Sequence, residues 1–415
     1  MFSRRSLLRM SATALATAPL APTARAVTSA RNLVVVFAFG GWDTTAVFDP
    51  KPGADAVDTP AGSWADFGAL ALWRATDLGA DGRAYLNQHA PRMAVVNGVA
   101  VNSLVHEAAL QIVLSGQVGD HHPPDVGARI AAALGADRPL PYLTTGSSAR
   151  PRELAAQAGT VGYSNQLFSL LSPDYAWPGP DGGAAPGFQP DPTVQAAVDA
   201  YLTTAHGTLD RVRTSPGRNA QKLADWMESH ERAGRIRQHT AAGGLFADPD
   251  LFADLAPWRR AARALSEGFS RAVFVQDEGY WDTHGGNAQQ PGLFTNLFRG
   301  LGQLLDELES AGIRDETLVL VLSEMGRSPL LNAQQGKDHW PFTSAMLVGA
   351  DVRPGVVRGT DASLVQRRVS LASGEPDPEG HALTAADVLA TTAHLMGADA
   401  AALYPEGEVI RAIVA

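Results

Sequence analysis

The sequence predicts an α/β protein with a largely parallel β-sheet, and two observations support this. Residues 33–39 and 317–322 are short, continuous apolar runs of the kind found in strands that are buried on both faces. Amphipathic segments lie between such runs, and residues 293–310 keep five leucines on one side of the expected helix. Strands that alternate with helices are typical of sheets whose strands run parallel.

The expected elements follow one another along the chain in this alternating order. We predict strands at residues 33–39, 93–101, 272–276, 317–322 and 344–348. We predict helices at residues 102–114, 126–134, 255–271, 293–310 and 384–396, the last with Thr384 as its N-cap. Residues 193–239 are polar with a helical pattern, and we expect a cap-like insertion near residues 165–240 within one domain, residues 27–415.

Composition excludes several classes of protein. The chain has 415 residues, 45% of them hydrophobic and 18% charged, which is a globular composition. Its formal net charge of −10 disfavours nucleic acid as a partner. It contains no cysteine, which removes disulfides, thiolate metal ligands and a cysteine nucleophile.

The N-terminus has the pattern of an export signal. Arg4 and Arg5 form a twin-arginine pair, a weakly apolar, Ala-rich stretch follows, and residues 24–26 read Ala-Arg-Ala, a cleavage pattern. We therefore expect residues 1–26 to be a twin-arginine signal peptide and the mature protein to be periplasmic or otherwise exported. The stretch is too short and too broken by proline to be a membrane span, and we expect none in the mature chain.

Polar residues that carry chemistry recur directly after the expected strands. In an open α/β sheet, ligands bind beyond the carboxyl ends of the strands, so these positions are candidates for a site. Imidazole and carboxylate ligands suit zinc, manganese or iron. The candidates are Asp43, Ser103, His106, Asp282, His284, Glu324, Arg327, Asp338 and His339.

Several of these residues also have an ordinary structural interpretation. Ser103 is at the position of a helix N-cap, and His106 fits a core histidine on a helix face. Glu324 follows a buried strand and has Arg327 three residues away as an ion-pair partner. A purely structural interpretation fits Asp282 and His284 less well. Residues two apart in an extended loop point the same way and can bind one ion.

Taken together, the motifs carry a resemblance. They are Gly40-Gly41-x-Asp43, residues 281–285 (WDTHG), residues 324–329 (EMGRSP), and residues 337–341 (KDHWP). In these motifs the chain resembles an uncharacterised bacterial family of twin-arginine-exported proteins in the alkaline-phosphatase/sulfatase-like superfamily.

The resemblance implies a three-layer α/β/α sandwich with a mixed, mostly parallel sheet and one or two divalent ions, most often zinc. It places Asp43, Asp282, His284 and His339 as metal ligands, with Glu324 where the superfamily usually has an Asp-His pair. We add Asp338 to the candidate ligands. Ser103 matches the nucleophile's place at a helix start. The formylglycine signature of sulfatases is absent from the sequence.

The sequence favours two functions over a third, weaker one, that of a secreted glycan- or envelope-binding protein. The first is an exported metal-dependent hydrolase of phosphoric esters, with Ser103, His106 and Arg327 as catalytic residues and a small anionic ester as substrate. The second is a catalytically inactive member of the superfamily, a metal-stabilised module that binds an exported partner protein.

Overall fold

The computed structural model describes residues 32–118, 123–161, 218–240 and 255–415, and parts of 193–204. Within these residues the main sheet has eight strands in the order β12-β4-β11-β8-β1-β7-β5-β6. Their bounds are Gly355–Arg358, Met93–Ala100, Phe342–Gly349, Thr317–Leu322, Asn32–Ala38, Ala272–Asp277, Tyr142–Thr145 and Ala158–Val161. Every pairing is parallel except those of β11, which runs antiparallel to β4 and β8.

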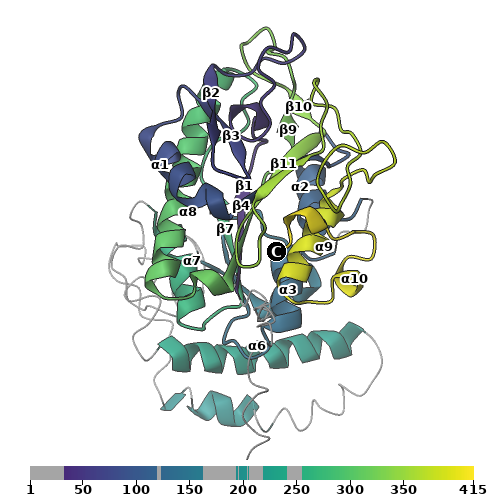
Figure 1. The fold of residues 1–415 in the computed structure, drawn as a ribbon. Coiled ribbons are helices and arrows are strands. Elements are labelled where there is room, and N and C mark those ends of the chain that lie inside the picture. Colours follow the sequence, from purple (N-terminus) through teal and green to yellow (C-terminus); the bar gives the residue numbers. More distant parts are fainter. Residues whose placement is uncertain are drawn as a thin grey trace, which may run out of the picture.

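Helices cover both faces of the sheet, so the predicted three-layer α/β/α class is confirmed (Figure 1). One face packs against α1 (Ala80–His89), α7 (Ala256–Ser266) and α8 (Gln290–Ser310). The other packs against α2 (His106–Ser115), α3 (Val126–Leu134) and α9 (Ala385–Leu395), with α10 (Ala400–Leu403) beside α9. In β1, Val34 and Val36 join the first core while Leu33 and Val35 join the second, as strand alternation requires.

Two small antiparallel ribbons complete the described strands. The first pairs β2 (Gly62–Asp66) with β3 (Ala71–Ala75). The second pairs β9 (Gly326–Arg327) with β10 (His339–Trp340), and so closes the segment between β8 and β11 into a loop above the sheet. This loop contains four of the residues that the sequence singled out.

The predicted cap region lies only partly within the described residues. The signal peptide at residues 1–26 and much of residues 162–217 are outside them. The described helix of the cap region is α6 (Arg218–Thr240), which packs below the sheet (Figure 1). There Arg235 donates to the carbonyl of Ala136 at 3.5 Å. Ala136 precedes β5, so this contact is at the amino ends of the strands. Helix α6 therefore does not cover the carboxyl ends, where a lid over the candidate site would have to lie.

The helix expected at residues 102–114 starts later than predicted. Helix α2 begins at His106, and Val105, not Asn102 or Ser103, is the N-cap residue. Asn102 has a φ of 58°, a left-handed conformation that keeps the chain out of the helix. Residues 101–105 instead form a loop that brings the carbonyl of Leu104 to His339.

Candidate functional site

Four side chains with metal-binding atoms meet at the carboxyl edge of the sheet. His106 is the first residue of α2, which follows β4. Asp282 and His284 lie in the loop after β7, and His339 begins β10 just before β11. Strands β4, β7 and β8 all end at this edge, while β11 starts there because it runs the other way. The antiparallel strand thus brings His339 to the same end of the sheet as the other three residues.

Three of these side chains are close enough to share one ion, and the fourth, His284, reaches two of them. Candidate ligand atoms of His106, Asp282 and His339 all lie within 4.8 Å of one another. Nε2 of His106 is 3.5 Å from Oδ2 of Asp282, and Nε2 of His339 is 3.5 Å from its Oδ1. Nε2 of His284 is 3.2 Å from the same Oδ1. Three imidazoles and one carboxylate form a ligand set that suits zinc, with manganese or iron as alternatives.

Each of the three imidazole rings is held through its other nitrogen. Nδ1 of His106 is 2.7 Å from Oε1 of Glu324, and Nδ1 of His284 is 3.0 Å from Oδ1 of Asp338. Nδ1 of His339 lies 2.6 Å from the carbonyl oxygen of Leu104. A carbonyl or carboxylate oxygen can only accept, so in each ring the proton belongs on Nδ1 and Nε2 keeps a lone pair. Protein metal sites orient their histidine ligands in this way.

The free nitrogens provide an independent test of whether a cation fits. Nε2 of His106 is buried and has no hydrogen-bond partner among the described residues. Nε2 of His284 and Nε2 of His339 are only 2.9 Å apart. Two lone pairs at that distance repel unless a proton or a metal ion lies between or beside them. Both observations fit a cation at the centre of the four side chains.

The charges around this centre shift the pKa values of its members in different directions. The hydrogen bond to Glu324 raises the pKa of His106, whereas burial lowers the pKa of His339. Burial also acts to raise the pKa of Asp282, but the hydrogen bond from Arg327 and its charge outweigh burial, and that pKa is lowered. Asp282 therefore stays ionised, as a metal ligand must.

The sequence interpretation treated Glu324 and Asp338 as metal ligands, and the structure places both one contact away from the centre. Glu324 is fully buried and also accepts from the backbone N–H of Gly40 at 2.7 Å. Asp338 is exposed and accepts from Asn332 at 3.1 Å. The hydrogen bond from His284 holds the pKa of Asp338 below its usual range. Both carboxylates contact the distal nitrogens of ligand histidines, which is a positioning role.

The sequence offered Glu324 as the ion-pair partner of Arg327, and in the structure Arg327 pairs with Asp282 instead. Its side chain is fully buried and donates to Oδ1 of Asp282 at 2.6 Å. It also donates to the carbonyls of Gly40 and Gly41 and to that of Lys337. Arg327 thus ties the loop after β1 to both ligand-bearing loops and fixes the carboxylate of Asp282.

Asp43 lies outside the cluster of four. Its side chain is fully buried and forms an ion pair with Lys337, which is also fully buried, at 2.9 Å. Its oxygens further accept from Thr45, through the backbone N–H at 3.1 Å and the hydroxyl at 2.7 Å, and from Asn287 at 2.6 Å. Since these donors already satisfy both oxygens, we leave Asp43 out of the proposed ligand set.

Gly40 allows the loop after β1 to pass close to Asp282. It has a φ of 125°, and a Cβ added there would lie 2.6 Å from the backbone nitrogen of Asp282. A side chain at this position would force the two loops apart. The glycine pair noted in the sequence therefore permits close contact between backbones.

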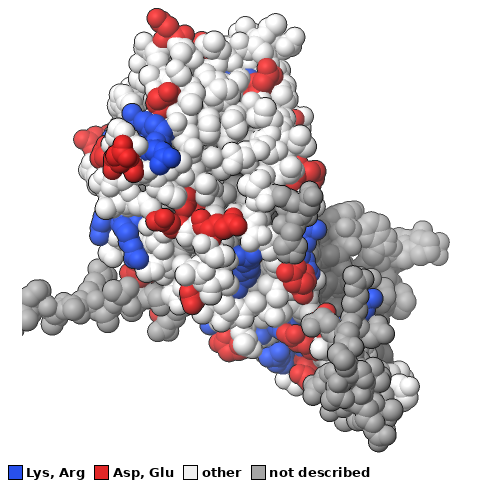
Figure 2. Space-filling model, turned by 90° about the vertical axis from the view of Figure 1, so that its right-hand side faces the viewer, with Lys and Arg blue, Asp and Glu red and all other residues white. Residues whose placement is uncertain are grey.

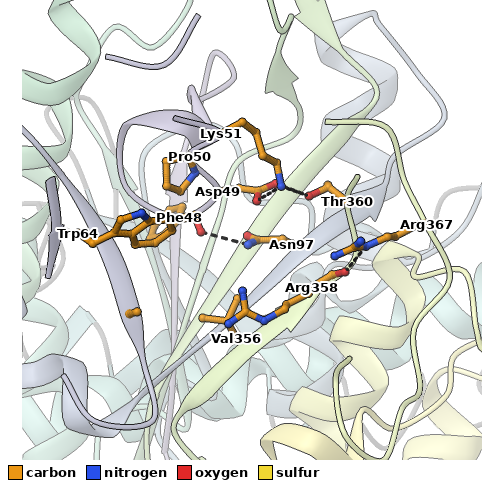
Figure 3. Close-up of a pocket in the computed structure, with 11 residues that line it drawn as sticks. Phe48, Asp49, Pro50, Lys51, Trp64, Asn97, Val356, Arg358, Thr360 and Arg367 are labelled. Carbon is orange, nitrogen blue, oxygen red and sulfur yellow. Dashed lines mark hydrogen bonds and ion pairs between the residues drawn. The ribbon is translucent and has the colours of Figure 1, made fainter. Parts of the chain in front are cut away.

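The same loop is anchored further along, at the pocket drawn in Figure 3. Lys51 pairs with Asp49 at 2.7 Å and donates to Thr360 at 3.0 Å. Asn97 of β4 donates to the carbonyl of Phe48 at 3.1 Å (Figure 3). The residues that form these bonds line a cavity of about 140 Å³, and the bonds fasten the loop to β4 and to the segment after β12.

Ser103 comes three residues before the candidate ligand His106, but its hydroxyl forms hydrogen bonds within its own loop. Its Oγ accepts from the backbone N–H of Val105 at 3.1 Å. The next residue, Leu104, supplies the carbonyl that holds His339. Sequence reasoning missed that carbonyl, the Asn332 amide and the buried role of Lys337. A backbone oxygen has no side-chain signal, whereas Lys337 did stand in the motif at residues 337–341.

None of the helices among the described residues combines the length and apolar character that a membrane crossing requires. A search of curated proteins found no match to the chain.

Solved structures with a similar arrangement share little sequence with this chain. A protein in the alkaline phosphatase superfamily from Vibrio parahaemolyticus is 11% identical, with 89% of this chain and 67% of that one covered and a TM-score of 0.39. A 2-O GAG sulfatase is 8% identical, with 91% and 75% covered and a TM-score of 0.40. The lipoteichoic acid synthase from Listeria monocytogenes is 11% identical, with 93% and 77% covered and a TM-score of 0.34.

One family model matches the chain. It is described as "Protein of unknown function (DUF1501)", and it matches residues 255–409. The matched segment includes Asp282, His284 and His339, so it contains three of the four residues at the centre, and His106 comes from the part of the chain before it.

Proposed function

We propose that this protein is an exported, metal-dependent hydrolase of phosphoric esters. The observation that carries the proposal is the convergence of three Nε2 atoms and the Asp282 carboxylate, with every Nδ1 held by an oxygen acceptor. His106, Asp282, His284 and His339 would hold a divalent ion, zinc being the best fit to these ligands. Such an ion would supply Lewis-acid polarisation of a phosphoryl oxygen and a lowered pKa for a bound hydroxyl or water.

The protein's own residues would prepare the centre in three ways. Glu324, Asp338 and the Leu104 carbonyl fix the rings, so that little reorganisation is needed when substrate binds. Arg327 fixes Asp282. The Ser103 hydroxyl or a water would then attack phosphorus, the bond to the alcohol oxygen would break, and the alcohol would leave with a proton.

Export by the twin-arginine route is part of the proposal and rests on residues 1–26. A small anionic ester is the proposed substrate. Folded export with a metal already bound is compatible with a ligand set that draws on three separate loops, because such a set exists only in the folded chain.

A second function has a specific observation in its favour. The Ser103 hydroxyl is engaged with Val105, and Arg327 is fully committed to protein groups. A protein without a free nucleophile or a free cation in its site would be an inactive, metal-stabilised module that serves an exported partner.

Metal analysis followed by a rate measurement tests both functions. We expect protein purified from the exported fraction to contain a divalent metal, and His284→Ala to lose it. His394→Ala is the matched control, since His394 lies in the last turn of α9, is half-buried and contacts Arg411. Metal-dependent hydrolysis of aryl phosphates that is lost in His284→Ala supports the hydrolase. Bound metal without turnover supports the inactive module, and protein without metal contradicts both.

A further inference from the structure

The buried pair of Asp43 and Lys337 bears on how many ions the site holds. The resemblance allows one or two ions and gives Asp43 as a ligand. In the structure the Lys337 ammonium is already the cation at Asp43, 2.9 Å from its Oδ2. Its other donors reach the carbonyl of Asp58 at 2.8 Å and the hydroxyl of Thr45 at 3.3 Å. An ammonium that uses all its donors inside the protein fills the place that a second metal ion would need.

The charges of the described site residues can then be balanced. Asp43 cancels Lys337, and Asp282 cancels Arg327, through ion pairs at 2.9 Å and 2.6 Å. Glu324 and Asp338 remain, and one divalent ion would neutralise both. With neutral histidines the loaded centre has no net charge, and both of its cationic side chains are buried and committed.

The surroundings of the centre offer apolar contacts in place of charge. Leu104 is 52% exposed, Val105 65%, Tyr280 71% and Leu330 52%, and each lies on a loop that leads to a ligand. On the face drawn in Figure 2, the middle of the upper half shows few charged side chains. Exposed apolar side chains on the loops that lead to the ligands are available to contact an organic group of a bound ester.

A groove that borders the two ligand-bearing loops also offers few charged side chains. It measures about 770 Å³ and is lined mostly by residues 52–62 with Trp73, and on its other side by Gly286, Asn287 and Gln335 of the two ligand-bearing loops. Among the described residues, its lining includes Asp58 and Asp77 but no lysine or arginine. A groove of this kind suits a neutral organic group and disfavours a second phosphate.

From these observations we infer that the centre holds a single divalent ion and selects monoanionic phosphodiesters over dianionic phosphomonoesters. The inference rests on the proposed function. A dianion would bring two uncompensated charges into a neutral, partly buried centre, whereas a diester brings one charge and a second organic group that the apolar loops can contact.

The number of ions is tested by elemental mass spectrometry on protein equilibrated with excess zinc and then desalted. We expect about one zinc per chain, because the described residues bring together one set of candidate ligand atoms. About two zinc ions per chain that survive desalting would overturn the single-ion inference while leaving the hydrolase intact. Absence of zinc would contradict the proposed function itself.

Charge selection is tested first by binding, which does not depend on turnover. Zinc-loaded protein is titrated at pH 8 with diethyl phosphate, a monoanion, and with ethyl phosphate, a dianion, in a calorimeter. We expect diethyl phosphate to bind about tenfold more tightly. The same preference is expected in kcat/KM for bis(4-nitrophenyl) phosphate over 4-nitrophenyl phosphate. Tighter binding of ethyl phosphate overturns the inference.

An added cation gives a sharper test with a matched control. Leu104→Lys places an ammonium on the loop beside His339, whereas Val118→Lys places it beyond the far end of α2, on a side chain that is also exposed. We expect Leu104→Lys to shift the preference toward ethyl phosphate several-fold and Val118→Lys to leave it unchanged. Equal shifts in both variants would show that overall charge, not charge at the centre, sets the preference.

Discussion

Replacing Lys337 with methionine is the most informative perturbation of the fold around the site. Methionine is one atom shorter than lysine and keeps most of the volume of the side chain, but it removes the charge. The change leaves the fully buried Asp43 carboxylate without its cation. Removing one partner of a buried ion pair costs about 3–5 kcal/mol, because the other charge remains in a medium that solvates it poorly.

The contacts of Asp43 and Asp58 narrow the expected loss of unfolding free energy. Asp43 still accepts from Thr45 and Asn287, which solvate part of the charge. The carbonyl of Asp58 also loses a donor, but Asp58 is exposed, so water replaces it. We therefore expect the lower end, about 3 kcal/mol of lost unfolding free energy. The double variant Asp43→Asn/Lys337→Met removes both charges and should recover at least about 1 kcal/mol of that loss.

Urea unfolding followed by tryptophan fluorescence measures these losses. Trp42 and Trp281 are fully buried next to the pair and report on the local structure. Lys337→Arg is the control that keeps the charge. A loss below about 1 kcal/mol for Lys337→Met, or a double variant as unstable as the single one, would refute the view that this pair is a desolvated ion pair.

Three further predictions concern single positions. Glu324→Gln should weaken zinc binding about 10- to 100-fold in a calorimetric titration while circular dichroism stays unchanged, because the group that orients His106 loses its charge. Gly40→Ala should abolish zinc binding, measured in the same way, since its Cβ would lie 2.6 Å from the nitrogen of Asp282. Burial and Arg314 lower the pKa of His89 to about 4, so the unfolded chain takes up this proton first as the pH falls. Unfolding free energy should therefore drop by up to about 3 kcal/mol between pH 6.5 and pH 4, and His89→Gln should flatten that part of the profile in urea titrations.

The central strands could be predicted from the sequence because burial on both faces leaves a direct record in residue type. After their first residues, Asn32 and Thr317, β1 and β8 are continuous apolar runs, and every residue in them is buried. Helices α3 and α8 were equally clear from their apolar spacing. Strand β5 was missed because Tyr142–Thr145 is short and half polar. The reversed direction of β11 was missed because an apolar run does not encode strand direction.

The sequence predicted which residues form the site better than it predicted how they are arranged. Asp282, His284 and His339 were expected to bind metal together, and they lie together in the structure. The separation of ligands from the residues that orient them depends on contacts between distant parts of the chain. Nothing near Asp43 in the sequence points to Lys337, because the pair forms only when the loops after β1 and β9 meet.

The reversed direction of β11 has a consequence for how this site can change. The segment from Ser323 to Pro341 leaves the sheet at the end of β8 and returns at the start of β11, and these two strands are hydrogen-bonded neighbours. Its two ends are therefore fixed side by side on a rigid support, while the β9–β10 ribbon gives it an internal brace. Such a segment can be lengthened, shortened or exchanged between homologous chains as a unit without altering the connectivity of the sheet. Recombination within this protein's relatives would thus replace Glu324, Arg327, Lys337 and His339 together, and a transplanted segment should carry its own internal contacts with it.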